Sequence, residues 1–84
     1  MSPQVITLLY FAAVRDAMGA SEETLDLPRE VLTVGDLARL LEGRPALSGK
    51  LGQVRFAVNE TFADPDTKVA HGDVVALIPP VAGG

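Results

Sequence analysis

Two apolar stretches near opposite ends of the chain predict its most buried strands. Residues 5–11 (VITLLYF) are rich in β-formers, and both alternate sets of positions are largely apolar, which indicates a central strand covered on both faces. Residues 73–78 (DVVALI) have the same character and end at Pro79, which has no amide hydrogen to donate to a sheet. We therefore expect the first and last strands to lie together at the centre of one sheet.

A helical period follows the first strand and recurs in the middle of the chain. Residues 12–18 are helix formers, and Gly19 is a natural helix stop. Residues 33–42 predict the clearest helix, because Thr33 suits the N-cap and Asp36 stands three residues later in a capping-box arrangement. The apolar stripe of this helix consists of Val34, Leu37, Ala38, Leu40 and Leu41. Gly43 is expected to end it.

Shorter alternating stretches complete the predicted sheet. Residues 24–27 alternate, with Leu25 and Leu27 inward, and residues 53–59 predict a further strand. Residues 61–63 suggest a short edge strand. The helical stripe must then pack on one face of a mixed sheet, which predicts an α+β domain of the β-grasp, ubiquitin-like type. A ferredoxin-like or other small α+β sandwich is the competing topology.

Composition narrows the classes of function. The 84 residues predict one small domain, and the absence of cysteine excludes disulfides, iron–sulfur clusters and zinc–thiolate sites. A net charge of −4 argues against nucleic acid as a partner, because phosphate binding needs clustered Lys and Arg. The apolar run at residues 5–14 is too short to span a bilayer and follows no positive charge. We expect a cytoplasmic protein without a membrane partner.

No catalytic set is evident in the body of the chain. Residues 43–51 (GRPALSGKL) resemble a phosphate-binding loop, but five residues separate the glycines and Leu51 replaces the required Ser or Thr. His71 is the only histidine and is interpreted as a turn residue, without partners for a metal site. The acidic residues Asp64, Asp66 and Asp73 have no calcium-loop spacing, so local hydrogen bonds to turn backbone are their expected role.

The most distinctive stretch is the end of the sequence, residues 79–84 (PPVAGG). Two prolines predict a stiff extended arm, about 20 Å long at roughly 3.3 Å per residue, after a domain at residues 1–78. Gly83 and Gly84 lack Cβ atoms, so a terminal carboxylate could enter a narrow tunnel. An ATP-using enzyme could convert the Gly84 carboxylate to an acyl-adenylate. A sulfur nucleophile would then form a thiocarboxylate, and a lysine amine an isopeptide.

Four other residues are candidates for contacts with a partner. Phe11, Phe62 and Ile78 are apolar residues at strand ends or in an edge strand, so they belong either to the core or to an interface. Arg15 follows the first strand closely. It would contact a partner's carboxylate or an adenylate, or else remain solvated near a helix end.

Three segments, in order along the chain, resemble the small subunit of molybdopterin synthase, a ubiquitin-like sulfur carrier. Residues 9–15 (LYFAAVR) are similar to its first strand and Phe-Ala-x-x-Arg segment, and residues 56–60 (FAVNE) to its Val-Asn segment. Residues 71–84 (HGDVVALIPPVAGG) are similar to its ending, Gly-Asp-x-Val-Ala followed by Pro-Pro-Val-x-Gly-Gly. The similarity covers essentially the whole chain, and this last motif is its specific part.

The resemblance implies a non-catalytic sulfur-donor subunit of a transferase complex. A ubiquitin-activating-type enzyme would use ATP to adenylate Gly84, which would become a thiocarboxylate and donate sulfur to cyclic pyranopterin monophosphate in molybdenum cofactor biosynthesis. The large synthase subunit would receive the tail, in a heterotetramer of two small and two large subunits. This chain itself would bind no cofactor and no metal. Partner contacts would involve Phe11, Phe62, Ile78, Pro79, Pro80, Val81 and Arg15, with Gly83 giving the tail access.

Other functions fit the same sequence. The chain could carry sulfur for thiamine or for thiolated tRNA. It could be a protein modifier joined to lysines through Gly84, or a binding module whose tail is never activated. An isopeptide on a target protein would identify the modifier, whereas the absence of any ATP-dependent modification would identify the binding module.

Overall fold

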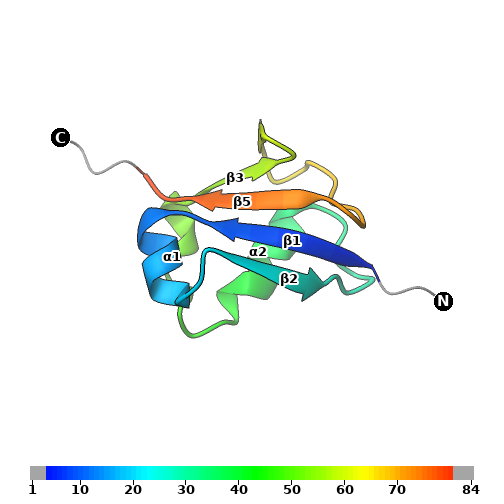
Figure 1. The fold of residues 1–84 in the computed structure, drawn as a ribbon. Helices are drawn as coiled ribbons and strands as arrows, with labels where there is room; N and C mark the ends of the chain where they lie inside the picture. Colours follow the sequence, from blue (N-terminus) through cyan, green and yellow to red (C-terminus); the bar gives the residue numbers. More distant parts are fainter. Residues whose placement is uncertain (1–3, 81–84) are drawn as a thin grey trace.

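A computed structural model describes residues 4–80, which form one five-stranded mixed sheet with two α-helices (Figure 1). The strands are β1 (Val5–Tyr10), β2 (Glu22–Asp26), β3 (Arg55–Val58), β4 (Thr61–Ala63) and β5 (Val74–Ile78). The helices are α1 (Ala12–Met18) and α2 (Val34–Glu42), and a 3-10 turn spans Leu51–Gln53. Residues 81–84, which include most of the expected tail, lie outside the described residues.

The strand order is β2-β1-β5-β3-β4, so the first and last strands are neighbours inside the sheet. They pair in parallel, with Leu8 opposite Val75 and Tyr10 opposite Leu77. The pairs β1–β2, β5–β3 and β3–β4 are antiparallel. A parallel central pair flanked by two hairpin-forming strands is the β-grasp arrangement. The prediction of this fold is confirmed, and the ferredoxin-like alternative is wrong.

Helix α2 covers one face of the sheet and contributes three residues to the buried core (Figure 1). Its capping box is present, because the Thr33 side chain accepts a hydrogen bond from the Asp36 amide at 3.2 Å and Asp36 accepts one from the Thr33 amide. Three residues of the expected stripe are buried: Val34, Leu37 and Leu41. Leu40 is 39% exposed, so its assignment to the core was wrong. It follows Arg39 on the side of the helix turned to solvent.

Helix α1 ends as the sequence predicted. Gly19 adopts a left-handed backbone with φ 75° and donates its amide hydrogen to the Arg15 carbonyl at 2.9 Å. The predicted third strand begins two residues later than expected, at Arg55. The reason is the 3-10 turn before it, where the Val54 amide donates to the Leu51 carbonyl at 3.1 Å.

The histidine and two of the turn acids, Asp64 and Asp73, have the local roles that were expected. Among residues 4–80, the Asp66 side chain does not make the hydrogen bond expected of it. The Val5 amide donates to Nδ1 of His71 at 2.9 Å, which fixes the turn before β5. Asp73 accepts a hydrogen bond from the Ala70 amide, and Asp64 accepts one from the Asp66 amide. No helix among residues 4–80 has the length and apolar character needed to cross a membrane.

The second face of the sheet differs from the prediction. In β1, Ile6, Leu8 and Tyr10 are buried against the core, whereas the alternate residues Val5, Thr7 and Leu9 are only half-buried. Within residues 4–80, both helices contribute their buried residues to a single core cluster with the first set. The expectation that β1 is covered on both faces was therefore wrong, and its apolar second face remains accessible.

Candidate functional site

The accessible face carries a groove of about 530 Å³ that brings together three predicted partner-binding residues, Phe11, Phe62 and Ile78. Most of the residues around the groove are apolar. Besides the three predicted residues, it is lined by Leu9, Ala57, Asn59, Glu60, Val74 and Ala76. Phe11 and Phe62 are 46% and 56% exposed, which is unusual for phenylalanine in a small domain. A contiguous patch of this kind is typical of a protein interface.

Strand register explains why the groove is hollow. Leu9 of β1 pairs with Ala76 of β5, Ala76 pairs with Ala57 of β3, and Ala57 pairs with Phe62 of β4. Directly paired residues point to the same face, so these four side chains form one row across the sheet. The two alanines occupy the middle of the row and the large side chains its ends. The small alanine side chains therefore form the floor of the groove, and the larger side chains of Leu9 and Phe62 form its walls.

The backbone at both ends of the groove is held in left-handed conformations. At one end, β1 turns into α1 through Ala12, whose φ of 49° costs about 1 kcal/mol for a non-glycine residue, and Phe11 lies at this turn. At the other end, Asn59 and Glu60 have φ values of 50° and 74° in the β3–β4 turn. The Asn59 side chain joins this turn to β5, because it donates to Asp73 at 3.1 Å and accepts from the Val74 amide at 2.9 Å.

The other predicted partner-binding residues do not line this groove. Arg15 is exposed on α1, with its Nε 3.9 Å from an Asp16 carboxylate oxygen. Pro79 and Pro80 form one wall of a second cleft, of about 570 Å³, against residues of α1 and of the segment 47–54. Val81, Gly83 and Gly84 lie outside the described residues, so their predicted roles stay predictions.

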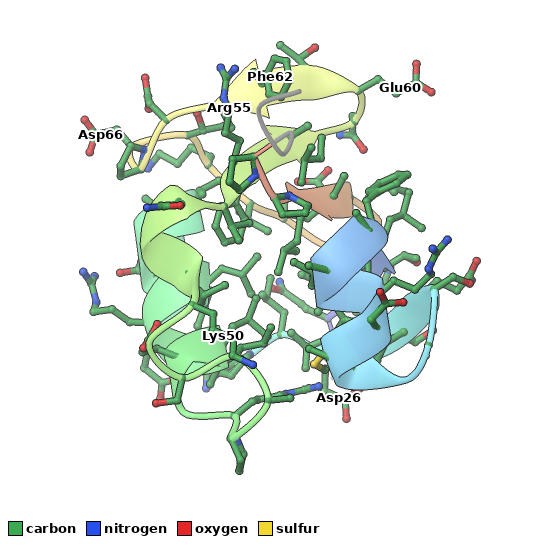
Figure 2. The ribbon with its side chains drawn as sticks, turned by 90° about the vertical axis from the view of Figure 1, so that its left-hand side faces the viewer. Asp26, Lys50, Arg55, Glu60, Phe62 and Asp66 are labelled. Carbon is green, nitrogen blue, oxygen red and sulfur yellow. The ribbon has the colours of Figure 1, made fainter. Side chains whose placement is uncertain are left out.

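Arg55 is a further residue beside the groove that the sequence did not indicate. The Cζ atom of Arg55 lies 3.9 Å from the centroid of the Phe62 ring, and Figure 2 shows the two side chains together along the β3–β4 hairpin. Seven positions separate the residues in sequence, and they belong to different strands. Only the hairpin register places them on one face, so no local motif could have indicated the contact.

The side chains with displaced pKa values lie away from the groove. Burial, and then a hydrogen bond to Glu23, raise the pKa of the Tyr10 hydroxyl. The Arg44 guanidinium, 2.6 Å from Glu23, lowers the pKa of that carboxyl and has its own pKa raised in return. Hydrogen bonds from the Leu32 amide, Thr33 and Arg39 lower the pKa of Asp36. Residues 4–80 also contain no group of three His, Asp or Glu side chains placed to hold a metal ion.

The chain is similar to known proteins over nearly its full length. The model of the ThiS family matches residues 8–84. A molybdopterin synthase sulfur carrier subunit from Chlamydomonas reinhardtii is 38% identical over 81 residues, which cover 94% of this chain and 98% of the relative.

Two solved structures share the fold. A putative molybdopterin converting factor, subunit 1, from Pyrococcus furiosus has a TM-score of 0.80 and 30% identity, over 93% of this chain and 99% of that one. Small archaeal modifier protein 1 from H. volcanii has a TM-score of 0.79 and 26% identity, over the same shares of the two chains, 93% and 99%.

Proposed function

The chain belongs to the ThiS family, and on this basis we propose that it is the sulfur carrier subunit of molybdopterin synthase. The observation that supports the proposal is that the apolar groove lies next to the point where β5 ends and residues 79–84 begin. Ile78 lines the groove and is the last residue of β5, which continues directly into residues 79–84. A docking surface joined to a Gly-Gly segment is what a carrier needs. The name of the Chlamydomonas relative supports molybdopterin as the product.

The reactive group in this proposal is the carboxylate of Gly84. A carboxylate is a poor acyl donor because its charge repels nucleophiles. An activating enzyme of the ubiquitin-activating type would let a carboxylate oxygen attack the α-phosphorus of ATP, with loss of pyrophosphate. Sulfide released by a sulfur donor would then attack the acyl carbon and displace AMP, which leaves a thiocarboxylate. The sulfur would pass to cyclic pyranopterin monophosphate. No step needs a catalytic side chain from this chain, which acts as the sulfur donor.

The folded body would hold the chain on the large synthase subunit. Phe11, Phe62 and Ile78 are the proposed apolar anchors, since large exposed side chains around a hollow are common energetic centres of interfaces. Pro79 and Pro80 would stiffen the approach to Val81. Gly83 would let the tail pass a cleft that a side chain would block. Arg15 is a proposed contact with the large subunit outside the groove. Two pairs, each of one small and one large subunit, would form a heterotetramer.

A second candidate function is protein modification. The likeness to small archaeal modifier protein 1 supports it, because the same activated Gly84 could react with a lysine amine instead of sulfur. The two functions share the adenylation step and differ only in the nucleophile. The product attached at Gly84 therefore distinguishes them.

The test compares the full chain with a variant that lacks Gly84, each incubated with the activating enzyme, ATP and a sulfur donor. Tandem mass spectrometry of the C-terminal peptide is required, because exchanging oxygen for sulfur adds nearly the same mass as oxidising Met1 or Met18. We expect an ATP-dependent thiocarboxylate at Gly84, and loss of sulfur transfer in the deletion variant without a change in unfolding.

A residue outside both clefts provides the control for this deletion. Thr24 is exposed on β2, so Thr24→Ala should leave both folding and sulfur transfer unchanged. Undiminished sulfur transfer by the deletion variant would show the carrier function to be wrong. An isopeptide-linked product in place of the thiocarboxylate would favour protein modification.

A further inference from the structure

Arg55 is a cation beside the apolar groove. It is exposed on β3, and its guanidinium lies over the ring of Phe62. Such a stack is favourable, because the cation is attracted to the electron-rich face of the ring. It also restricts two side chains that would otherwise move freely. The contact therefore holds the charge and the exposed ring in a defined arrangement before any partner binds.

Strand register places Arg55 on the groove face of the sheet. It pairs directly with Ile78 of β5, and it stands two residues before Ala57 on the same strand. Residues two apart in a strand share a face, so Arg55 continues the groove at the end where the chain passes into Pro79. Glu60 lies at the opposite end of the hairpin, as Figure 2 shows. The apolar floor thus has a positive group at the tail end and a negative group at the far end.

The charge of Arg55 has no carboxylate partner within residues 4–80. Three other arginines do: Arg15 with Asp16, Arg39 with Asp36, and Arg44 with Glu23. Stacking occupies only the flat face of the guanidinium. Its N–H groups lie in the plane at the edge and remain available, in the fork geometry that matches a carboxylate.

We infer that Arg55 is a specificity-determining contact at the rim of the groove, and that it pairs with an Asp or Glu carboxylate of the large synthase subunit. The acidic residue would stand next to an apolar side chain that fills the hollow over Ala57 and Ala76. This inference rests on the proposed function and adds the chemistry of the partner's surface. A charge at the rim selects the partner and its orientation more than it adds affinity.

The test measures affinity for the purified large subunit by titration calorimetry, at about 0.05 M and about 0.5 M salt. Arg55→Met keeps an apolar stem over Phe62 but removes the charge. We expect it to weaken binding by about threefold to tenfold at low salt, with a smaller loss at high salt. Arg55→Lys keeps the charge without the planar fork and should recover part of the affinity.

Arg39→Met is the matched control. Arg39 is exposed on α2, across the core from the groove, and its removal changes the net charge by the same amount. It should leave the affinity unchanged. Equal binding by Arg55→Met and the full chain, or a loss that salt does not reduce, would overturn the inference while the proposed function stands. Failure of the unsubstituted chain to bind the large subunit at all would overturn both.

Discussion

At the scale of single residues, one cluster joins parts of the chain that local patterns do not connect. The Tyr10 hydroxyl donates to Glu23, and Arg44 Nη1 donates to Glu23 Oε1 at 2.6 Å. The three side chains come from β1, from β2 and from the segment after α2. Glu23 and Arg44 are each about one-third exposed, so the pair is only partly screened by water. Charge-assisted hydrogen bonds in this cluster therefore join β1 and β2 to the segment after α2.

We predict that Glu23→Gln lowers the free energy of unfolding by about 1–2 kcal/mol at neutral pH, because it weakens two charge-assisted hydrogen bonds. The hydrogen bond from Arg44 is the main cause of the lowered pKa of Glu23, so the folded state binds the proton more weakly than the unfolded state. The stabilisation is therefore complete above the unfolded pKa of about 4.3 and is lost as pH falls through the lower folded value.

Urea unfolding of the unsubstituted chain and of Glu23→Gln across this pH range checks the prediction. The difference between their free energies of unfolding should narrow below about pH 4. Glu22→Gln is the control, since Glu22 is exposed on the same strand and no ion pair among residues 4–80 involves it. Equal destabilisation by both substitutions would contradict the assigned role of Glu23.

At the scale of elements, α2 is the part of the fold whose sequence and structure agree most closely. Thr33 accepts a hydrogen bond from the Asp36 amide, and Asp36 accepts from the amides of Leu32 and Thr33 at 2.9 Å and 3.2 Å. These bonds satisfy amide groups that have no partner within the helix. The helix start therefore depends on two side chains only three residues apart.

Thr33→Ala should lower the free energy of unfolding by about 1 kcal/mol, because the first turn of α2 loses its capping oxygen. Thr33→Ser keeps the oxygen and should restore most of the stability. Thermal or chemical unfolding measures both effects. Thr24→Ala, an exposed threonine on the edge strand β2, should stay within about 0.5 kcal/mol of the unsubstituted chain. Failure of serine to rescue the cap would mean that the hydroxyl is not the stabilising group.

At the scale of the whole molecule, the two faces of the sheet differ: one packs in the core, and the other carries the proposed docking surface. One face packs with α2 and contains fully buried residues such as Leu8, Val75 and Leu77. The other carries the groove of Phe11, Phe62 and Ile78, in which the side chains are exposed or half-buried. Substitutions on the two faces should therefore have different consequences.

Phe11→Asp should weaken binding to the large subunit by about tenfold or more, since it places a charge at an apolar anchor. The same substitution should change the free energy of unfolding by less than about 1 kcal/mol, because nearly half of the Phe11 side chain is already in water. Leu8→Ala, in contrast, should cost about 2–5 kcal/mol of stability. Titration calorimetry and urea unfolding measure the two properties.

A second exposed apolar residue controls for the loss of surface hydrophobicity. Leu32 is 57% exposed just before α2, outside the groove, and Leu32→Asp should retain full affinity. The docking assignment of the groove would be wrong if Phe11→Asp bound the large subunit as tightly as Leu32→Asp does.

The sequence by itself determined the features that depend on neighbouring residues. It predicted both helices, the cap at Thr33, the stop at Gly19 and the central position of the first and last strands, because alternation and helical period are local properties. It also indicated the chemistry of the Gly-Gly ending through a resemblance that the family match supports. Phe11, Phe62 and Ile78 were identified as candidates, but their patterns alone favoured the core over an interface.

Tertiary structure decided which of those apolar residues would remain exposed. The row from Leu9 to Phe62 exists only because four strands pair in one register, and that register joins segments more than fifty residues apart. The same register brings Arg55 over Phe62. Leu40 fell outside the core because the sheet contacts only part of the apolar stripe of α2. Pairing between distant strands depends on the packing of the whole chain, so no single segment contains the information that forms the groove.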